Sequence, residues 1–180
     1  NYGPACLLFE KPTGCKATMI GYPYDDLDSW RSIYPEDVFE NQFLLLSDGW
    51  ERGNRLLGEL PVKSSALDEL IDCAEAAYCH FRSTYLQIRF VRVRDGREKG
   101  DLAEIAEEEA SLALRLAAVQ RHNPCIGYES SNHYFYNTAL LAEKYINCRY
   151  LSDRMRRGGS LSGEKQQRRG EPITAPRLNQ

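Results

Sequence analysis

Apolar residues recur at helical spacing in the first third of the chain. Five of them follow one another at intervals of four, three, four and seven positions: Phe39, Phe43, Leu46, Trp50 and Leu57. An α-helix places residues at such intervals on one face. Pro35 suits the first turn of a helix, and the two acids that follow it suit the positive end of the helix dipole. The pattern therefore predicts an amphipathic helix over residues 35–58.

Three further stretches carry the same signature. Apolar positions three or four residues apart predict helices over residues 66–94, 101–122 and 137–155. Serines at 64 and 65, with acids shortly after them, are typical of a helix start. The alternation from Val91 to Arg94 could also form a strand, but it continues the helical stripe. We therefore favour the helix.

Four amphipathic helices joined by short connections are typical of an all-α bundle, which we place over residues 35–156. Residues 1–34 are rich in glycine, proline and aromatic side chains without a sustained period. We expect an irregular arm there that packs on another structure, such as the end of an upstream domain. Residues 157–180 hold almost nothing apolar and predict a disordered tail. The expected core side chains are Phe39, Phe43, Leu46, Trp50, Phe81, Tyr85, Ile88, Leu112, Leu116, Tyr145 and Leu151.

Charge is distributed unevenly along the 180 residues, whose net charge is −3. From Ser152 onward there are seven basic and three acidic residues, while the preceding residues include sixteen basic and twenty-three acidic. An acidic body does not suit a phosphate backbone, so we expect no nucleic-acid partner. The basic tail could touch an anionic partner, although a solvated tail is favoured. No stretch approaches the ~20 apolar residues of a membrane span, so no membrane partner is expected.

The six cysteines are scattered and form no C-x-x-C pair or zinc-ligand spacing. We expect buried free thiols and no metal or cofactor. Unpaired cysteines favour a reducing, cytoplasmic location. The chain begins at Asn1 rather than at a methionine, which suggests a fragment of a longer protein. Any signal peptide would then lie in the missing segment.

The stretch from Ile126 to Tyr136 concentrates polar and aromatic side chains between two predicted helices. Its candidate ligand-binding residues are Tyr128, Glu129, Asn132, His133, Tyr134 and Tyr136. Connections often carry function because a rigid scaffold holds them while their side chains reach a ligand. Tyrosine rings with hydrogen-bonding neighbours suit sugars, and the carboxylate and imidazole could act as acid or base. The alternative is that these residues only cap or brace a helix.

A second candidate is the acidic cluster at Asp25, Asp26 and Asp28. Neighbouring carboxylates can hold a hard cation or supply an acid–base pair, as in glycosidases. The spacing lacks the glycine and the distal glutamate of a calcium-binding loop. A turn that caps the following residues is the interpretation we favour. We expect the cluster and the polar stretch to lie at one end of the bundle. Alternating helices would place them at opposite ends, so the arm must fold back by about 30 Å.

A third candidate is the basic face of the second predicted helix. Arg82, Arg89 and Arg92 share one side of it and could pair with acids of the third helix or line a cleft. We favour ion pairing between helices. The acidic run at 107–109 is expected on the outer side of that helix. No Ser-His-Asp signature, phosphate loop or H-E-x-x-H motif is present in the sequence, so the catalytic residues are unknown.

Three segments carry a resemblance to known proteins. The first runs from Gly21 to Phe39 around Tyr-Pro-Tyr-Asp-Asp-Leu-Asp-Ser-Trp, and the second is His80-Phe-Arg-Ser-Thr-Tyr-Leu-Gln-Ile-Arg-Phe90. The third joins Ile126-Gly-Tyr-Glu-Ser-Ser-Asn-His-Tyr-Phe-Tyr136 to the segment 143–151. In this order they resemble the C-terminal helical region of large, mostly uncharacterised bacterial proteins similar to glycoside hydrolases. The resemblance covers about residues 3–152, and the tail after Leu151 departs from it.

The resemblance implies a barrel-like catalytic domain upstream of this chain. It also implies that the Asp25-Asp26 segment and the polar stretch face the barrel's active site, and it assigns no catalytic residue here. We therefore expect an accessory domain that helps to shape a sugar-binding cleft and has little activity alone. The alternative is a structural or interaction module whose arm docks a partner. An independent enzyme is disfavoured, because no complete catalytic constellation is visible.

Overall fold

The computed structural model describes residues 3–19, 21, 23–61, 64–129, 134–135 and 137–158. The predicted all-α class and its four main helices are confirmed. The elements, in chain order, are α1 (Leu27–Trp30), α2 (Glu36–Gly58), α3 (Ser65–Arg94), α4 (Leu102–His122), β1 (Tyr128–Glu129), β2 (Tyr134–Phe135) and α5 (Thr138–Arg156). The tail predicted over 157–180 lies outside the described residues beyond Gly158.

Side-chain caps fix where three of the main helices begin. The Ser64 hydroxyl accepts a hydrogen bond from the Leu67 amide at the start of α3, and the Asn137 side chain accepts one from Leu140 in α5. The Asp101 carboxylate accepts two such bonds at the start of α4. Each cap satisfies an amide that has no partner within its helix. Residues 91–94 continue α3, so the strand alternative for them is wrong.

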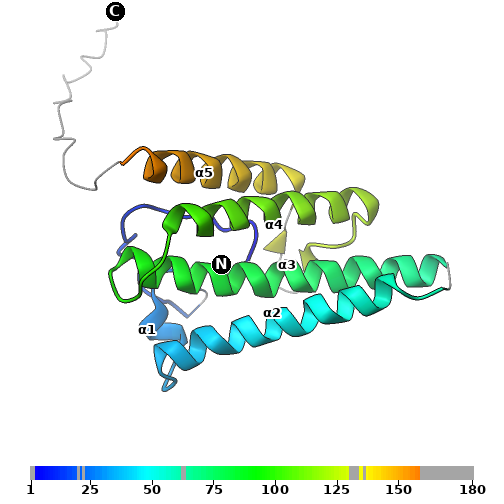
Figure 1. Cartoon of the computed structure of the whole chain (residues 1–180), viewed down its shortest axis with the longest axis horizontal. Helices are drawn as coiled ribbons and strands as arrows, with labels where there is room; N and C mark the ends of the chain where they lie inside the picture. Colours follow the sequence, from blue (N-terminus) through cyan, green and yellow to red (C-terminus); the bar gives the residue numbers. More distant parts are fainter. Residues whose placement is uncertain are drawn as a thin grey trace, which may run out of the picture.

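The four main helices lie antiparallel in an open row (Figure 1). Extensive contacts join α2 to α3, α3 to α4 and α4 to α5. Among the described residues, no comparable contact joins α2 to α5, as it would in a closed four-helix bundle. The two edge helices therefore each have one helical neighbour, and much of the outward surface of α2 is exposed.

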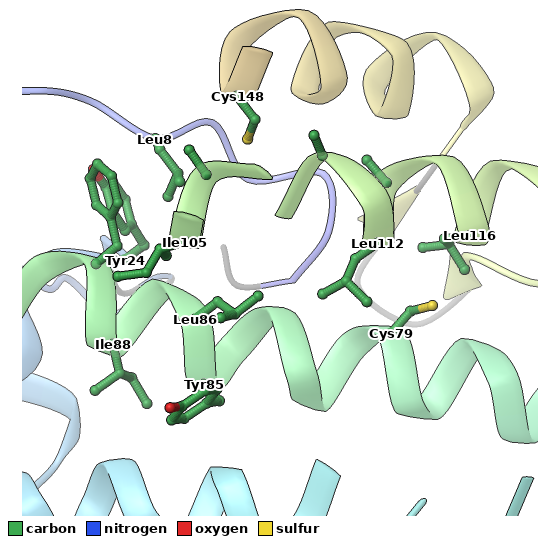
Figure 2. Packing of buried hydrophobic residues seen from close by; sticks show 14 of the residues in the cluster. Leu8, Tyr24, Cys79, Tyr85, Leu86, Ile88, Ile105, Leu112, Leu116 and Cys148 are labelled. Atoms are coloured by element: carbon green, nitrogen blue, oxygen red, sulfur yellow. The ribbon is translucent and has the colours of Figure 1, made fainter. Parts of the chain in front are cut away.

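The N-terminal arm packs on the helices of its own chain. Leu8 and Tyr24 belong to the same buried cluster as Ile105 of α4 and Cys148 of α5 (Figure 2). The Leu8 amide donates to the Asn147 side chain at 2.9 Å, and the Asn147 amide group donates back to the Leu8 carbonyl at 3.0 Å. The Asn147 side chain thus satisfies both backbone hydrogen-bonding groups of Leu8, as a neighbouring β-strand would. The arm thus completes the core of the helical row.

The predicted core is confirmed in its centre and wrong at one edge. Tyr85, Ile88, Leu112, Leu116 and Leu151 are buried, whereas Phe39, Phe43, Phe81 and Tyr145 are partly buried. Leu46 and Trp50 are 41% and 37% exposed. The expectation failed for these two because α2 is an edge helix, and α3 covers only one of its faces.

Because the arm fills the core, we expect Leu8→Ala to destabilise the whole protein. Leu8 is fully buried, and loss of a buried leucine side chain costs about 2–5 kcal/mol. Urea unfolding followed by circular dichroism measures the free energy of unfolding. Leu114→Ala, at a leucine that is 52% exposed on α4, should change it by less than about 0.5 kcal/mol. Equal effects of the two substitutions would contradict the arm's place in the core.

Candidate functional site

Asp25 is held inside a cage of donors from its own chain. Its carboxylate accepts hydrogen bonds from the Thr13 amide and hydroxyl, both at 2.7 Å, and from the Arg94 guanidinium at 3.3 Å. Its side chain is nearly inaccessible to solvent. Burial tends to raise the pKa of this carboxyl group, but the donors from Thr13 and Arg94 outweigh it and hold the pKa below its ordinary value. Asp25 therefore anchors the arm to the last turn of α3.

Asp26, the next residue, has a similar structural role. Its carboxylate accepts hydrogen bonds from the Ser29 hydroxyl at 2.6 Å, the Ala17 amide at 2.8 Å and the Lys16 ammonium at 3.1 Å. The donors from Ser29 and Ala17 hold the pKa of this carboxyl group below its ordinary value. Asp28 is exposed and pairs with Arg31. These contacts favour the interpretation of the cluster as a turn.

The polar stretch forms a small antiparallel hairpin. Strand β1 pairs with β2 so that Tyr128 is opposite Phe135 and Glu129 is opposite Tyr134. The structure describes only the backbone of these strand residues, and Asn132, His133 and Tyr136 lie outside the described residues. The cap of α5 is Asn137, which follows the hairpin. The start of α5 therefore does not require Glu129 or His133 as its cap.

The acidic cluster and the end of α4, which the hairpin follows, lie at opposite ends of α3. Asp25 pairs with Arg94 at the end of α3. The hairpin follows the end of α4, where His122 Nδ1 lies 2.6 Å from the carboxylate of Asp72, in the second turn of α3. At about 1.5 Å per residue, Asp72 and Arg94 are about 33 Å apart along α3. Because the side chains of the hairpin lie outside the described residues, the expected convergence stays a prediction.

Ion pairing is confirmed for the basic face of α3, with α2 as its main partner. Arg89 and Arg92 both bind the carboxylate of Glu40 in α2, and Arg82 pairs with Glu108 of α4 and Asp48 of α2. A shallow hollow of about 150 Å³ opens beside Glu40. Its walls include Asp37, Asn41, Leu44, Tyr85 and Arg89. The hollow offers donors and acceptors to a small polar molecule, but its main charges are already neutralised within the chain.

The most deeply buried charges are Glu109 of α4 and Lys144 of α5. Both side chains are inaccessible to solvent, and the Lys144 ammonium lies 3.0 Å from the Glu109 carboxylate. The Ser83 hydroxyl of α3 lies 3.0 Å from both carboxylate oxygens, and Lys144 also donates to the Cys6 carbonyl of the arm. Burial tends to lower the pKa of Lys144, but the Glu109 carboxylate outweighs it and raises that pKa above its ordinary value. The pair joins four separate segments.

The expectation that residues 107–109 all lie on the outer side of their helix is wrong for Glu109. Its position falls four residues after Ile105 and three before Leu112, which places it on the buried stripe of α4. Lys144 likewise lies between Leu141 and Cys148 on the buried face of α5. The signal was present in the sequence as one acid and one base on facing apolar stripes. The run of three acids obscured it.

The cysteines add no evident chemistry. All six are free, but the expectation of buried thiols is wrong for Cys15, Cys73 and Cys125, which are exposed. Burial raises the pKa of Cys79 and Cys148 to about 12, which keeps them as thiols. Among the described residues, no group of three or more histidine, cysteine or acidic side chains is placed to hold a metal ion. No helix in the described ranges combines the length and apolar character needed to span a bilayer.

Comparison of the chain with protein-family models, with curated proteins and with solved structures found no match.

The buried pair makes a prediction about stability. Glu109→Gln leaves the Lys144 cation buried without a counter-charge, which should cost about 3–5 kcal/mol. The double variant Glu109→Gln/Lys144→Met removes that cation, so it should be more stable than Glu109→Gln alone. Urea unfolding of Glu109→Gln, of Lys144→Met and of the double variant measures this coupling. Asp28→Asn, in an exposed pair, is the control and should have little effect. Additive effects at Glu109 and Lys144 would contradict the coupling.

The two lowered pKa values predict acid sensitivity. Folding favours the ionised forms of Asp25 and Asp26, so their contribution is fully present above the unfolded-state pKa, about 3.9, and is lost as the pH falls through the folded-state pKa. We expect Asp26→Asn to be less stable than wild type near neutral pH and to lose less stability below about pH 4. Unfolding free energies across this range provide the measurement. If Asp26→Asn lost as much unfolding free energy below about pH 4 as wild type does, Asp26 would not be a source of the acid sensitivity.

Proposed function

We propose that this chain is a helical accessory domain of a carbohydrate-active protein similar to glycoside hydrolases. In this proposal the segment from Tyr128 to Tyr136 contributes polar and aromatic groups to a sugar-binding cleft, and a barrel-like domain upstream supplies the catalytic residues. The proposal rests on the resemblance of three sequence segments and on one feature of the hairpin.

The hairpin supports the proposal through the position of the helix cap. Asn137 caps α5, and the paired strands end before it. The sequence between the strands is Ser130-Ser131-Asn132-His133, four consecutive residues that can all hydrogen-bond. Because Asn137 already caps α5, helix capping does not explain why these four residues are all polar. Recognition of a hydroxyl-rich ligand is such a reason, since sugar sites combine aromatic faces with a few directed polar groups.

The Asp25 and Asp26 carboxylates do not belong to the proposed site. Their oxygens are occupied by donors of this chain, and Asp25 is anchored to the last turn of α3. This observation favours the second candidate, a structural or interaction module without a ligand role. The two candidates differ in what the hairpin does, and that difference can be measured.

Substitutions in the hairpin distinguish the two candidates. Two-dimensional NMR of the chain with millimolar xylose, galactose or glucuronic acid would follow binding. If the hairpin binds sugar, Glu129→Gln and His133→Ala should weaken binding about tenfold, a loss of about 1.4 kcal/mol, with little change in Tm. The cap variant Asp101→Ala is the matched control. It should lower stability by about 1 kcal/mol and leave sugar binding unchanged.

The opposite pattern would support the structural module. In that case Glu129→Gln and His133→Ala lower Tm, and none of the three sugars shifts any resonance from residues 126–137.

A further inference from the structure

The outward face of α2 carries an apolar stripe that its own chain leaves uncovered. Val38, Leu45 and Leu56 are 40%, 54% and 65% exposed, and they share one side of the helix because their spacings are seven and eleven residues. Leu46 and Trp50 extend the stripe on one flank. The helix lies at the edge of the row, away from α4 and α5 (Figure 1). We call this surface the α2 stripe.

Gly49 leaves a hole in the middle of the α2 stripe. A side chain added at Gly49 would meet only the Arg52 side chain, at 3.9 Å, and one added at Gly53 would meet nothing within 4 Å. Leu45, Leu46 and Trp50 surround Gly49 and border a shallow hollow of about 240 Å³. A glycine costs up to about 1 kcal/mol inside a helix, so the hole has a cost that close packing by a neighbour would offset.

We propose that the α2 stripe is a self-association surface, on which α2 of a second copy lies antiparallel. This inference does not depend on the proposed sugar-binding function. The spacing of residues along the stripe indicates that a second copy of α2 can pack on it. Its six facing positions are Val38, Gln42, Leu45, Gly49, Arg52 and Leu56, with spacings of four, three, four, three and four residues.

An antiparallel partner centred at the level of Ser47 pairs large positions with small or compatible ones. Leu45 of each copy then lies opposite the hole at Gly49 of the other copy, as a knob enters a hole. Val38 lies opposite Leu56, which makes an apolar layer at each end. The two copies thus fill each other's hollow by one symmetric operation, as an isologous dimer requires.

Charge favours this direction over the parallel one. In a parallel pair, Arg52 would face Arg52 of the second copy, and the hollows at Gly49 would face each other unfilled. In the antiparallel pair, Arg52 faces Gln42, whose amide oxygen can accept its hydrogen bond. The antiparallel pair also places the helix dipoles in opposite directions. Both copies expose Gln42 and Arg52, so neither contact has to be released first.

The size of the surface sets the expected affinity. The helix is about 35 Å long at 1.5 Å per residue, and one helical stripe buries less than the roughly 800 Å² per partner of a standard interface. We therefore expect a dimer of modest strength, with a dissociation constant on the order of 10 µM.

Sedimentation velocity of the complete 180-residue chain over a concentration series tests the proposal. Wild type should shift from monomer to dimer, and Leu45→Asp should raise the dissociation constant at least about tenfold. Leu114→Asp is the matched control, because Leu114 is a 52% exposed leucine on α4. It should dimerise like wild type. A wild-type chain that stays monomeric up to about 100 µM, or equal weakening by both substitutions, would overturn the proposal.

A second variant tests the register. Gln42→Glu places a carboxylate opposite Arg52 in the antiparallel pair and should tighten the dimer several-fold at low salt, with the gain lost at high salt. In a parallel pair the same substitution would place two carboxylates face to face and weaken the dimer. Weakening by Gln42→Glu would therefore refute the antiparallel arrangement. Folding is controlled by circular dichroism, since position 42 is exposed on the helix surface.

Discussion

The buried contact between Glu109 and Lys144 joins more of this molecule than any other described interaction. It connects α4 to α5 directly, α3 through the Ser83 hydroxyl, and the arm through the Cys6 carbonyl. A second polar contact extends it, because Gln87 donates both to Ser83 and to the Gly3 carbonyl. A buried charge that loses its counter-charge strongly destabilises the folded state, so each of these two groups requires the other to stay in place. The positions of three helices and the arm are therefore mutually dependent.

This network explains why an irregular segment can belong to the core. The arm has few apolar side chains with a regular period, and its backbone groups need partners when they are buried. Lys144, Asn147 and Gln87 supply those partners from three different helix positions. Leu8 then packs between the helices with both its amide and its carbonyl hydrogen-bonded to Asn147. The core formed by α3, α4 and α5 is therefore completed by residues 3–9, which form no helix or strand.

The sequence was informative about elements and less so about neighbours. Helix limits followed from apolar spacing and from caps such as Ser64 and Asn137, because both depend on residues close together in the chain. The burial of Leu46 and Trp50 was predicted wrongly, because an apolar side chain shows only that burial is favourable. On an edge helix such as α2, only the side that faces α3 is covered. Glu109 was misplaced because its partner is 35 positions away, on a different helix.

Among the candidate site residues, Asp25 and Asp26 were recognised as a cluster from the sequence. Their hydrogen-bond donors at Thr13, Ala17 and Arg94 could not be identified without the fold.

The span of the central contact also bears on how the chain reaches its folded state. The Lys144 ammonium meets the Cys6 carbonyl across 138 positions, and the Asn147 side chain meets Leu8 across 139. During synthesis, α2, α3 and α4 are all made before α5. Until Lys144 leaves the ribosome, the Glu109 carboxylate has no counter-charge, and closing α3 on α4 would desolvate it alone. We therefore expect α3 and α4 to stay loosely associated until α5 has been made and can supply Lys144.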